Sequence, residues 1–521
     1  MEKLPGINSE TSRRNFIKAA SMTSAAALVG RNGFAESSPG LPPAAALGQQ
    51  SPDATSNKSD KRIIAIQVPP QSFVDEGVDK CLDTLQEKAG VNVIMPIVYS
   101  YGWELIGRQV KGHPLPDHGV QAYGEIHGGS FTKVNPEFYT DSPISQDLRA
   151  PDLGNFDVLA DVIPKAKQRG IQTYACSSDS DYNPAFIPNF ERIAEIDVYG
   201  RITRSSCHNN PGTRSLQTAL LKDWFSNNDL DGFMWECERQ GPLDTALTAG
   251  RSRRVSLCCF CPHCVQKGRE QGIDVERTRA GYMALDRWIS QPDSEARQSD
   301  GSFVSLWRLL VGYPEILAWH KLWFSSKAEF YGLLYGTVKT VNPRAKVGWH
   351  IMHTVTYSPF YRSDVDYASI VNVSDFIKPS AYNNCAGPRF ADYIRNVQST
   401  MFRDFSPQEV LTMMYKILGY EGEEANLEKL PQTGLTANYV AHETRRAIAD
   451  VKGAVPIYPG IDIDIPTPLD TKQTQPSDVK AAVLAAFKAG ASGVVLSRKY
   501  SEMKLANLAG AGEALRELNA G

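Results

Sequence analysis

The hydrophobic positions of the chain fall into short apolar runs without polar alternation, and each run is separated from the next by a segment with apolar residues at helical spacing. Runs of this kind are typical of parallel strands that are covered by helices on both faces. The pattern predicts eight strands: Ile63–Val68, Val91–Val98, Ile171–Cys176, Asp231–Trp235, Lys346–His350, Phe376–Ala381, Ala454–Ile463 and Gly493–Ser497.

Eight alternating strand–helix units predict an α/β fold, a (β/α)8 TIM barrel with long insertions in its βα loops. A doubly wound open sheet is the alternative. No G-x-G-x-x-G pattern follows the first strand and no phosphate-loop motif occurs in the sequence, which disfavours the nucleotide-binding form of that alternative. We therefore expect residues 61–521 to form one barrel domain.

The first 35 residues have the features of an export signal. Arg13 and Arg14 form a twin-arginine pattern, and an Ala-rich apolar stretch follows over Ala19–Gly30. That stretch is too short to span a bilayer, and the small residues Gly33 and Ala35 suit a cleavage site. The pattern predicts a twin-arginine signal peptide over residues 1–35, and an amphipathic helix with a chance arginine pair is the alternative.

The following segment, residues 36–60, is rich in Ser, Pro, Ala and Gln and has no apolar periodicity. Such a composition predicts a disordered linker. Twin-arginine export carries folded proteins across the membrane, so we expect the mature chain to be periplasmic or secreted. We expect no stable membrane association after the signal is removed.

Composition and charge exclude further classes of protein. Of 521 residues, 42% are hydrophobic and 22% are charged, which gives enough apolar surface for a sizeable core. The net charge is −3, and removal of the signal takes away five basic and two acidic residues, which leaves −6. This charge gives no reason to expect a nucleic acid as partner, and a neutral oligo- or polysaccharide fits better.

Polar and aromatic residues follow the predicted strands, where the active sites of barrels lie. Aromatic rings suit the C–H faces of sugars, and charged or amide groups suit their hydroxyls. A lone aspartate in such a loop can instead cap the loop, and a histidine can belong to the core. The candidate sugar contacts are Tyr99, Trp103, His127, Asp179, Asp181, Arg239, His350, Tyr382, Asn383, Arg498 and Glu502.

Two pairs of carboxylates are candidates for glycosidic-bond cleavage. Glu238 and Glu236 follow the fourth strand, and a carboxyl group partly desolvated there could hold a raised pKa and act as an acid. Asp464 and Asp462 end the seventh strand, and Asp464 is ranked first as the catalytic partner. A separation of about 5–5.5 Å implies retention and about 6.5–9.5 Å implies inversion. Simple ion pairing with arginines is the alternative.

The cysteines form the sharpest local motif. Cys259, Cys261 and Cys264 have C-x-C-x-x-C spacing, which can wrap one tetrahedral Zn²⁺. Cys258 is the first candidate for the fourth ligand, and the others are His263, Cys207 and Cys237. A closed set of thiolates predicts a structural zinc and no organic cofactor. Disulfides or reduced packing cysteines are the alternatives.

These motifs resemble those of a known group of proteins. A strand that ends in a candidate catalytic Glu and is followed by the cysteine cluster is similar to the zinc-containing β-galactosidases of clan A, the large clan of retaining-glycosidase barrels. More closely, Glu238–Leu243, Cys259–Cys264 and Leu496–Met503 resemble uncharacterised twin-arginine-exported proteins described as glycosyl-hydrolase-like. The resemblance covers most of residues 62–518.

The resemblance implies a barrel whose acid/base follows the fourth strand, here Glu238 or Glu236, and whose nucleophile follows the seventh. The clan's nucleophile is normally Glu, whereas this chain offers Asp462 and Asp464 at that place. The function expected is an extracytoplasmic glycoside hydrolase acting on plant or microbial glycans. The alternatives are a non-catalytic carbohydrate-binding barrel and a metal-dependent sugar-modifying enzyme of the deacetylase or isomerase type.

Overall fold

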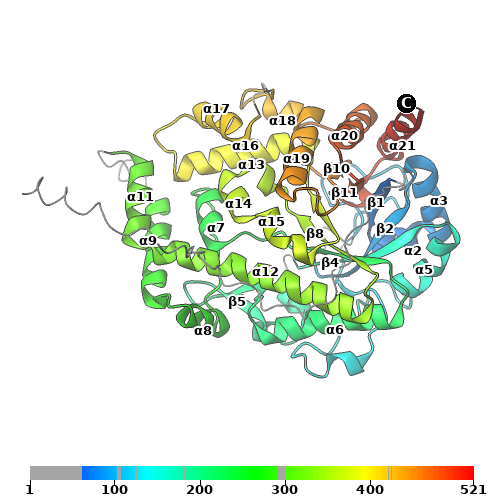
Figure 1. The fold of residues 1–521 in the computed structure, drawn as a ribbon, viewed down its shortest axis with the longest axis horizontal. Helices are drawn as coiled ribbons and strands as arrows, with labels where there is room; N and C mark the ends of the chain where they lie inside the picture. The colour runs from blue at the N-terminus through cyan, green and yellow to red at the C-terminus, as the bar shows by residue number, and fades with distance from the viewer. Residues whose placement is uncertain are drawn as a thin grey trace, which may run out of the picture. The chain divides into compact units, whose positions relative to one another are not determined.

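A ring of parallel strands forms the centre of the barrel (Figure 1). The computed structural model describes residues 62–102, 107–124, 126–179, 182–291, 300–420, 422–423 and 425–520. The predicted signal peptide and linker, Trp103 and Asp181 lie outside these residues. The strands are β1 (Ile63–Val68), β2 (Val93–Ser100), β4 (Gln172–Ser178), β7 (Gly232–Glu236), β8 (Lys346–Ile351), β9 (Phe376–Pro379), β10 (Gly460–Asp462) and β11 (Gly493–Ser497).

The strand order closes the sheet on itself. Parallel pairing runs in the order β10, β11, β1, β2, β4, β7, β8 and β9. Parallel bridges from Ile377 to Ile457 and from Ser380 to Gly460 then join β9 to the approach of β10. The (β/α)8 barrel prediction is therefore confirmed, and each of the eight predicted runs contains or overlaps one strand of the barrel.

The seventh strand is shorter than predicted. The apolar run begins at Ala454, but β10 begins only at Gly460. Pro456 and Pro459 interrupt the run, and a proline has no N–H to donate to a neighbouring strand. The hydrophobic pattern thus located the strand correctly and overestimated its length.

Helices cover the outside of the strands (Figure 1). Their starts follow capping rules: Asp157 accepts hydrogen bonds from the N–H groups of Leu159 and Ala160 at the start of α5. Gly90 and Gly419 end α3 and α17 in the left-handed conformation. The main outer helices are α3 (Val78–Ala89), α5 (Val158–Gln168), α6 (Pro211–Asn227), α12 (Glu315–Val341), α16 (Asn383–Thr400), α17 (Pro407–Leu418), α19 (Ala437–Asp450), α20 (Pro476–Lys488) and α21 (Leu505–Ala520).

Long insertions follow several strands, as the sequence predicts. After β4 the chain forms a small antiparallel pair, β5 (Ala194–Ile196) and β6 (Ile202–Ser206). After β7 and β8 it forms short helices before returning to the barrel. The insertion elements also include α2 (Pro70–Glu76), β3 (Gly129–Ser130), η1 (Pro136–Tyr139), η2 (Pro184–Phe186), η3 (Phe190–Arg192), α7 (Pro242–Thr248), α8 (Pro262–Glu270), α9 (Val275–Ser290), α11 (Ser302–Gly312), α13 (Thr354–Tyr357), α14 (Pro359–Asp364), α15 (Tyr367–Ile370), η4 (Val371–Val373), α18 (Leu430–Thr433) and η5 (Tyr500–Glu502).

In the part of the chain that the structure describes, no helix is both long and apolar enough to cross a bilayer.

Candidate functional site

A layer of polar side chains closes the barrel interior near the carboxyl ends of its strands. Gln67 of β1 donates a hydrogen bond to Glu236 of β7 at 2.6 Å. Lys378 of β9 donates to the side-chain oxygen of Gln67 at 2.8 Å and lies 4.0 Å from the Glu236 carboxylate. Glu236 is 4% exposed. The ammonium group of Lys378 therefore balances the charge of Glu236 inside the barrel, and Glu236 lies beneath the rim.

Glu238 lies two residues further along and faces the solvent. Its side chain is 50% exposed, and one carboxylate oxygen is 2.8 Å from Nε2 of His350. The other ring nitrogen of His350, Nδ1, is 2.9 Å from the ammonium group of Lys378. Because an ammonium can only donate, Nδ1 accepts and Nε2 carries the proton that His350 donates to Glu238. The chain of contacts fixes both the tautomer and the position of the carboxylate.

The charge state of Glu238 differs from the sequence prediction. Desolvation opposes ionisation, but the hydrogen bond from His350, with the charges of Arg389 and Arg498, lowers the pKa of Glu238 below its ordinary value. The expectation of a raised pKa is therefore wrong, because these partners outweigh the neighbouring apolar surface. Glu238 is a carboxylate rather than a carboxylic acid.

Asp462 and Asp464 both have the opposite shift, because burial raises the pKa of each carboxyl group. Asp462 is the last residue of β10 and is 1% exposed. Burial raises its pKa to about 6, although the N–H of Cys385 at 2.7 Å and the charge of Arg389 favour the ionised form. A Cβ on Gly460, two residues earlier, would lie 3.1 Å from the Lys378 side chain. Asp462 thus continues the inward face of the barrel towards the rim.

Asp464, ranked first as the catalytic partner, has different neighbours. Its backbone has a positive φ of 54°, which turns the chain away from the strand. Its carboxylate accepts from the N–H of Lys504 at 2.8 Å and from the side-chain amide of Asn507 at 2.8 Å. These bonds tie the loop after β10 to the start of α21. This geometry favours Asp462 over Asp464 as the second carboxyl group.

The end of β11 supplies a charged pair. Glu502 receives hydrogen bonds from Nε and Nη2 of Arg498 at 3.2 and 2.8 Å, and the Lys499 ammonium is 3.6 Å away. A carboxylate held by two cations is ionised and has its oxygens engaged. Glu502 therefore positions Arg498, whose charge also acts on Glu238.

A second network joins the predicted rim residues Asp179 and Arg239 to two residues that were not predicted, His208 and Glu195. Arg239 donates to Asp179 at 2.9 Å, and His208 lies 2.9 Å from the same carboxylate. Desolvation opposes ionisation, but Arg239 and His208 lower the pKa of Asp179 to about 2. Glu195 lies 3.5 Å from Arg239. Asp179 and Arg239 are therefore partners of each other, in a buried ion-pair network beside the barrel mouth.

The remaining predicted sugar contacts are spread around the rim. The hydroxyl of Tyr382 accepts a hydrogen bond from the ammonium group of Lys378 at 2.9 Å, so Tyr382 belongs to the polar layer. Tyr99 is fully buried and its hydroxyl has no hydrogen-bond partner. His127 stacks on Phe186, with ring centroids 4.2 Å apart. Asn383, at the start of α16, is buried and leaves its side-chain oxygen without a partner.

The segment after β2 reaches across to the last strand of the barrel. Ser501 donates to the carbonyl of Gly107 at 3.0 Å, and Asp117 accepts from the N–H of Leu505 at 2.8 Å. His118 lies 2.8 Å from the carbonyl of Met503. These bonds hold the described part of residues 102–152 against the loop after β11, so it is docked over this side of the rim.

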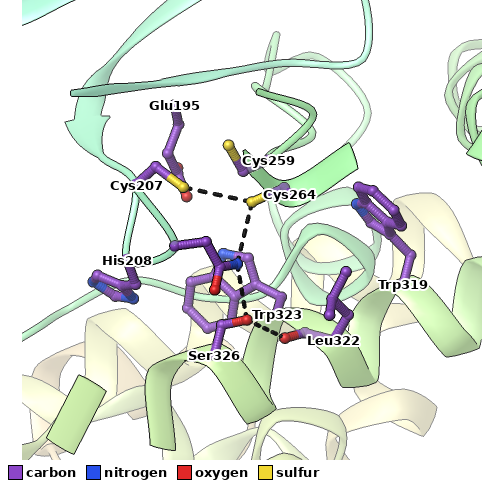
Figure 2. A pocket seen from close by; sticks show the side chains of 10 residues that line it. Glu195, Cys207, His208, Cys259, Cys264, Trp319, Leu322, Trp323 and Ser326 are labelled. Carbon is purple, nitrogen blue, oxygen red and sulfur yellow. Dashed lines mark hydrogen bonds between the residues drawn. The ribbon is translucent and has the colours of Figure 1, made fainter. Parts of the chain in front are cut away.

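The cysteine group lies beside the Asp179 network. Cys207 follows β6, and Cys264 belongs to the first turn of α8. The ligand sulfurs of Cys207, Cys259, Cys261 and Cys264 all lie within 4.8 Å of one another, and all four residues are buried. Figure 2 shows Cys207 and Cys264 pointing towards each other, with Sγ atoms 3.4 Å apart. Cys207, and not Cys258, completes the group.

The four sulfurs fit a tetrahedral metal ion. Zn–S bonds of about 2.3 Å place tetrahedral sulfurs about 3.8 Å apart, close to the distances of 3.4 and 3.5 Å from the Cys207 sulfur to those of Cys264 and Cys261. The cysteines of the described residues are all free of disulfides. Hydrogen bonds from the other three thiols lower the pKa of Cys261. The group therefore has the donors and the spacing of a metal site.

Some of these residues could not be found as site residues from the sequence. Lys378 had a signal, because it is a lone lysine in an apolar strand run. Arg389 lies inside α16 and had none. Cys207 lies 52 residues before Cys259 in the sequence, and only the pairing of β5 with β6 brings it to the cluster.

The solved structures similar to this chain include alpha-L-fucosidase isoenzyme 2 from Paenibacillus thiaminolyticus, with a TM-score of 0.47 and 11% identity over 88% of this chain and 50% of that chain. A beta-galactosidase from the psychrophilic Marinomonas ef1 has a TM-score of 0.49 and 10% identity over 88% of this chain and 59% of its own. The PgaB (BpsB) glycoside hydrolase domain from Bordetella bronchiseptica has a TM-score of 0.46 and 10% identity over 84% of this chain and 94% of its own.

This chain thus spans about half to three-fifths of the length of the first two proteins. No protein-family model and no curated protein matches the sequence.

Proposed function

We propose that the protein is a glycoside hydrolase that cleaves O-glycosidic bonds of plant or microbial glycans with two carboxyl groups at the C-terminal rim of the barrel. The observation that carries the proposal is the opposite direction of two pKa shifts at this rim, lowered at Glu238 and raised to about 6 at Asp462. Two carboxyl groups tuned apart in this way can serve as base or nucleophile and as acid.

The environments assign a role to each group. Glu238 stays ionised beside His350 and is exposed, which suits a nucleophile or a base that activates water. Asp462 retains its proton at mildly acidic pH, which suits a donor to the leaving oxygen. These roles reverse those that the resemblance implies for the fourth and seventh strands. Because Asp462 is buried, the proposal requires the side chains over it to move when substrate binds.

The cysteine group has a separate part in the proposal. We propose that Cys207, Cys259, Cys261 and Cys264 bind one structural Zn²⁺, which when bound crosslinks the end of β6 to the start of α8. Four protein ligands leave no open position for a substrate. Twin-arginine export of the folded, metal-loaded chain to the periplasm or the medium belongs to the same proposal. Fractionation of cells expressing the native and the Arg13→Lys, Arg14→Lys chains tests it.

The activity is expected to fall as the pH rises through about 6, because Asp462 then loses the proton that it donates. Glu238 remains ionised over this range, since its pKa lies below the ordinary value. Above the midpoint, kcat/KM on phenyl glycosides is expected to drop about tenfold per pH unit. The measurement is a pH–rate profile between pH 4 and 9 on a panel of aryl glycosides. A profile that stays flat above pH 6 contradicts the role of Asp462.

The variant Asp462→Asn tests the same role without a change of pH. It is expected to lower kcat/KM about 10²–10⁴-fold on phenyl glycosides and far less on dinitrophenyl glycosides, whose leaving group needs no proton. Asp464→Asn is the matched control, because its partners are Lys504 and Asn507. This control variant is expected to have a lower Tm, while its kcat/KM is expected to depend on the leaving group as it does in the wild type. The reverse result for the two variants would restore Asp464 as the catalytic group.

A further inference from the structure

A second group of metal-binding side chains lies apart from the carboxyl pair and the cysteine group. It consists of Asp244 of α7, His320 of α12 and Asp364, the last residue of α14. One ligand atom of each residue lies within 4.8 Å of the others. Nε2 of His320 is 2.9 Å from Oδ2 of Asp364 and 3.9 Å from Oδ2 of Asp244. Three helices therefore bring two carboxylates and one imidazole to a single point.

The charge of this group is not balanced by the described residues around it. Asp244 is 2% exposed, and its Oδ2 atom has no hydrogen-bond partner. Among the residues that the structure describes, the ion pairs of Asp244 and Asp364 are both with His320. A buried carboxylate in this position costs free energy unless a cation neutralises it.

The ring of His320 is held with Nε2 directed at the carboxylates. A Cβ on Gly241 would lie 2.6 Å from the ring, so only glycine allows the chain to pass so close. Phe324 packs edge-on, with ring centroids 5.0 Å apart. The N–H of Leu243 is 3.4 Å from Nδ1, which is long for a hydrogen bond. This long hydrogen bond is given up when Nδ1 carries the proton and Nε2 binds a metal.

The group is accessible from one side. The Asp364 side chain is 20% exposed and lines a cavity of about 280 Å³ together with Lys327, Tyr331, Tyr361 and His350. Of the three side chains, Asp364 is the one that lines this cavity, so the open positions of a bound ion would lie on the Asp364 side of the group. Carboxylate oxygens with one imidazole nitrogen suit divalent ions such as Mn²⁺, whereas four thiolates suit Zn²⁺.

We propose that Asp244, His320 and Asp364 bind one divalent metal ion of the Mn²⁺ type, with its remaining positions open towards the cavity. This site is independent of the glycosidase proposal and of the cysteine group. It stabilises the junction of α7, α12 and α14 by supplying the positive charge that these three helices lack at their meeting point.

Titration of the full wild-type protein with MnCl₂, followed by electron paramagnetic resonance of the free ion, counts bound Mn²⁺ without any variant. One bound Mn²⁺ per chain is expected, with a rise of a few degrees in Tm. Asp364→Asn and Asp244→Asn are each expected to abolish this binding, and Glu87→Gln, at an exposed position of α3, to leave it unchanged. Absence of binding at 1 mM Mn²⁺, or equal binding by wild type and both aspartate variants, overturns the proposal.

The competing occupant is a proton shared between the two carboxylates. In that case Mn²⁺ leaves Tm unchanged, and Asp244→Asn raises Tm near pH 8 by removing a buried charge. That pair of results also overturns the metal site. Neither result bears on glycoside hydrolysis, which the rim variants test separately.

Discussion

The variant Glu238→Gln is expected to lower kcat for aryl-glycoside hydrolysis about 10²–10⁴-fold or more, with little change in Tm. The side chain is half exposed, so the amide fits without a packing change. The amide oxygen can still accept the hydrogen bond that His350 donates, so the substitution removes the negative charge and keeps this contact. Because a nucleophile or base acts whatever the leaving group, phenyl and dinitrophenyl glycosides should lose rate together. The measurement is kcat for both substrates, beside circular dichroism of the folded variant.

Glu87→Gln on α3 is the matched control, since it removes one exposed carboxylate at a distance from the rim. It is expected to leave kcat unchanged. The anomeric configuration of the first wild-type product, followed by NMR, separates the two possible roles, because a nucleophile gives retention and a base that activates water gives inversion. Unchanged turnover in Glu238→Gln would refute the carboxylate mechanism. Binding of glycans by a wild type that hydrolyses none of the panel would identify a carbohydrate-binding barrel.

The barrel itself was predictable because each strand is covered on both faces. Strand β11 is buried along its whole length, and its centre therefore appears as the unbroken apolar run Val494–Leu496 in the sequence. The end of a run is less well defined, as β10 illustrates, because hydrophobicity persists through prolines that cannot pair. Closure of the sheet depends on register between β9 and β10, which lie far apart in the chain and leave no local signal.

The residue types of the site were predictable from the sequence, but their hydrogen-bond and ion-pair partners were less so. Glu238, His350 and Tyr382 follow or end strands, and the barrel brings them to one rim. The hydrogen bonds of His350 and Tyr382 depend on Lys378, and the lowered pKa of Glu238 depends in part on Arg389; long-range folding supplies both cations. Proximity to the strand end favoured Asp464 over Asp462 in the sequence, but the positive φ of Asp464 turns the chain away from the strand direction at that residue. In each case orientation, rather than position along the sequence, decided the role.

The variant Cys207→Ser is expected to remove one zinc equivalent and to destabilise the fold by more than about 4 kcal/mol, because a structural metal site contributes directly to folding free energy. The sulfur of Cys207 lies within 3.5 Å of both Cys261 and Cys264, so its loss leaves three buried thiolates with an incomplete shell. The measurements are zinc content by mass spectrometry and Tm with and without chelator. Glycoside hydrolysis by the remaining folded fraction is expected to keep its pH profile.

The variant Cys258→Ser tests whether Cys207, as in the structure, or Cys258, as predicted from the sequence, is the fourth metal ligand. Cys258 adjoins the motif and is buried, but its sulfur is outside the group of four. This variant is therefore expected to retain its zinc and to lose far less stability than Cys207→Ser. Equal zinc loss in the two variants would restore Cys258 as a ligand. If a reducing agent lowers Tm and a chelator does not, the cysteines form disulfides and the metal assignment fails, since thiolate–zinc bonds respond to chelators and disulfides to reduction.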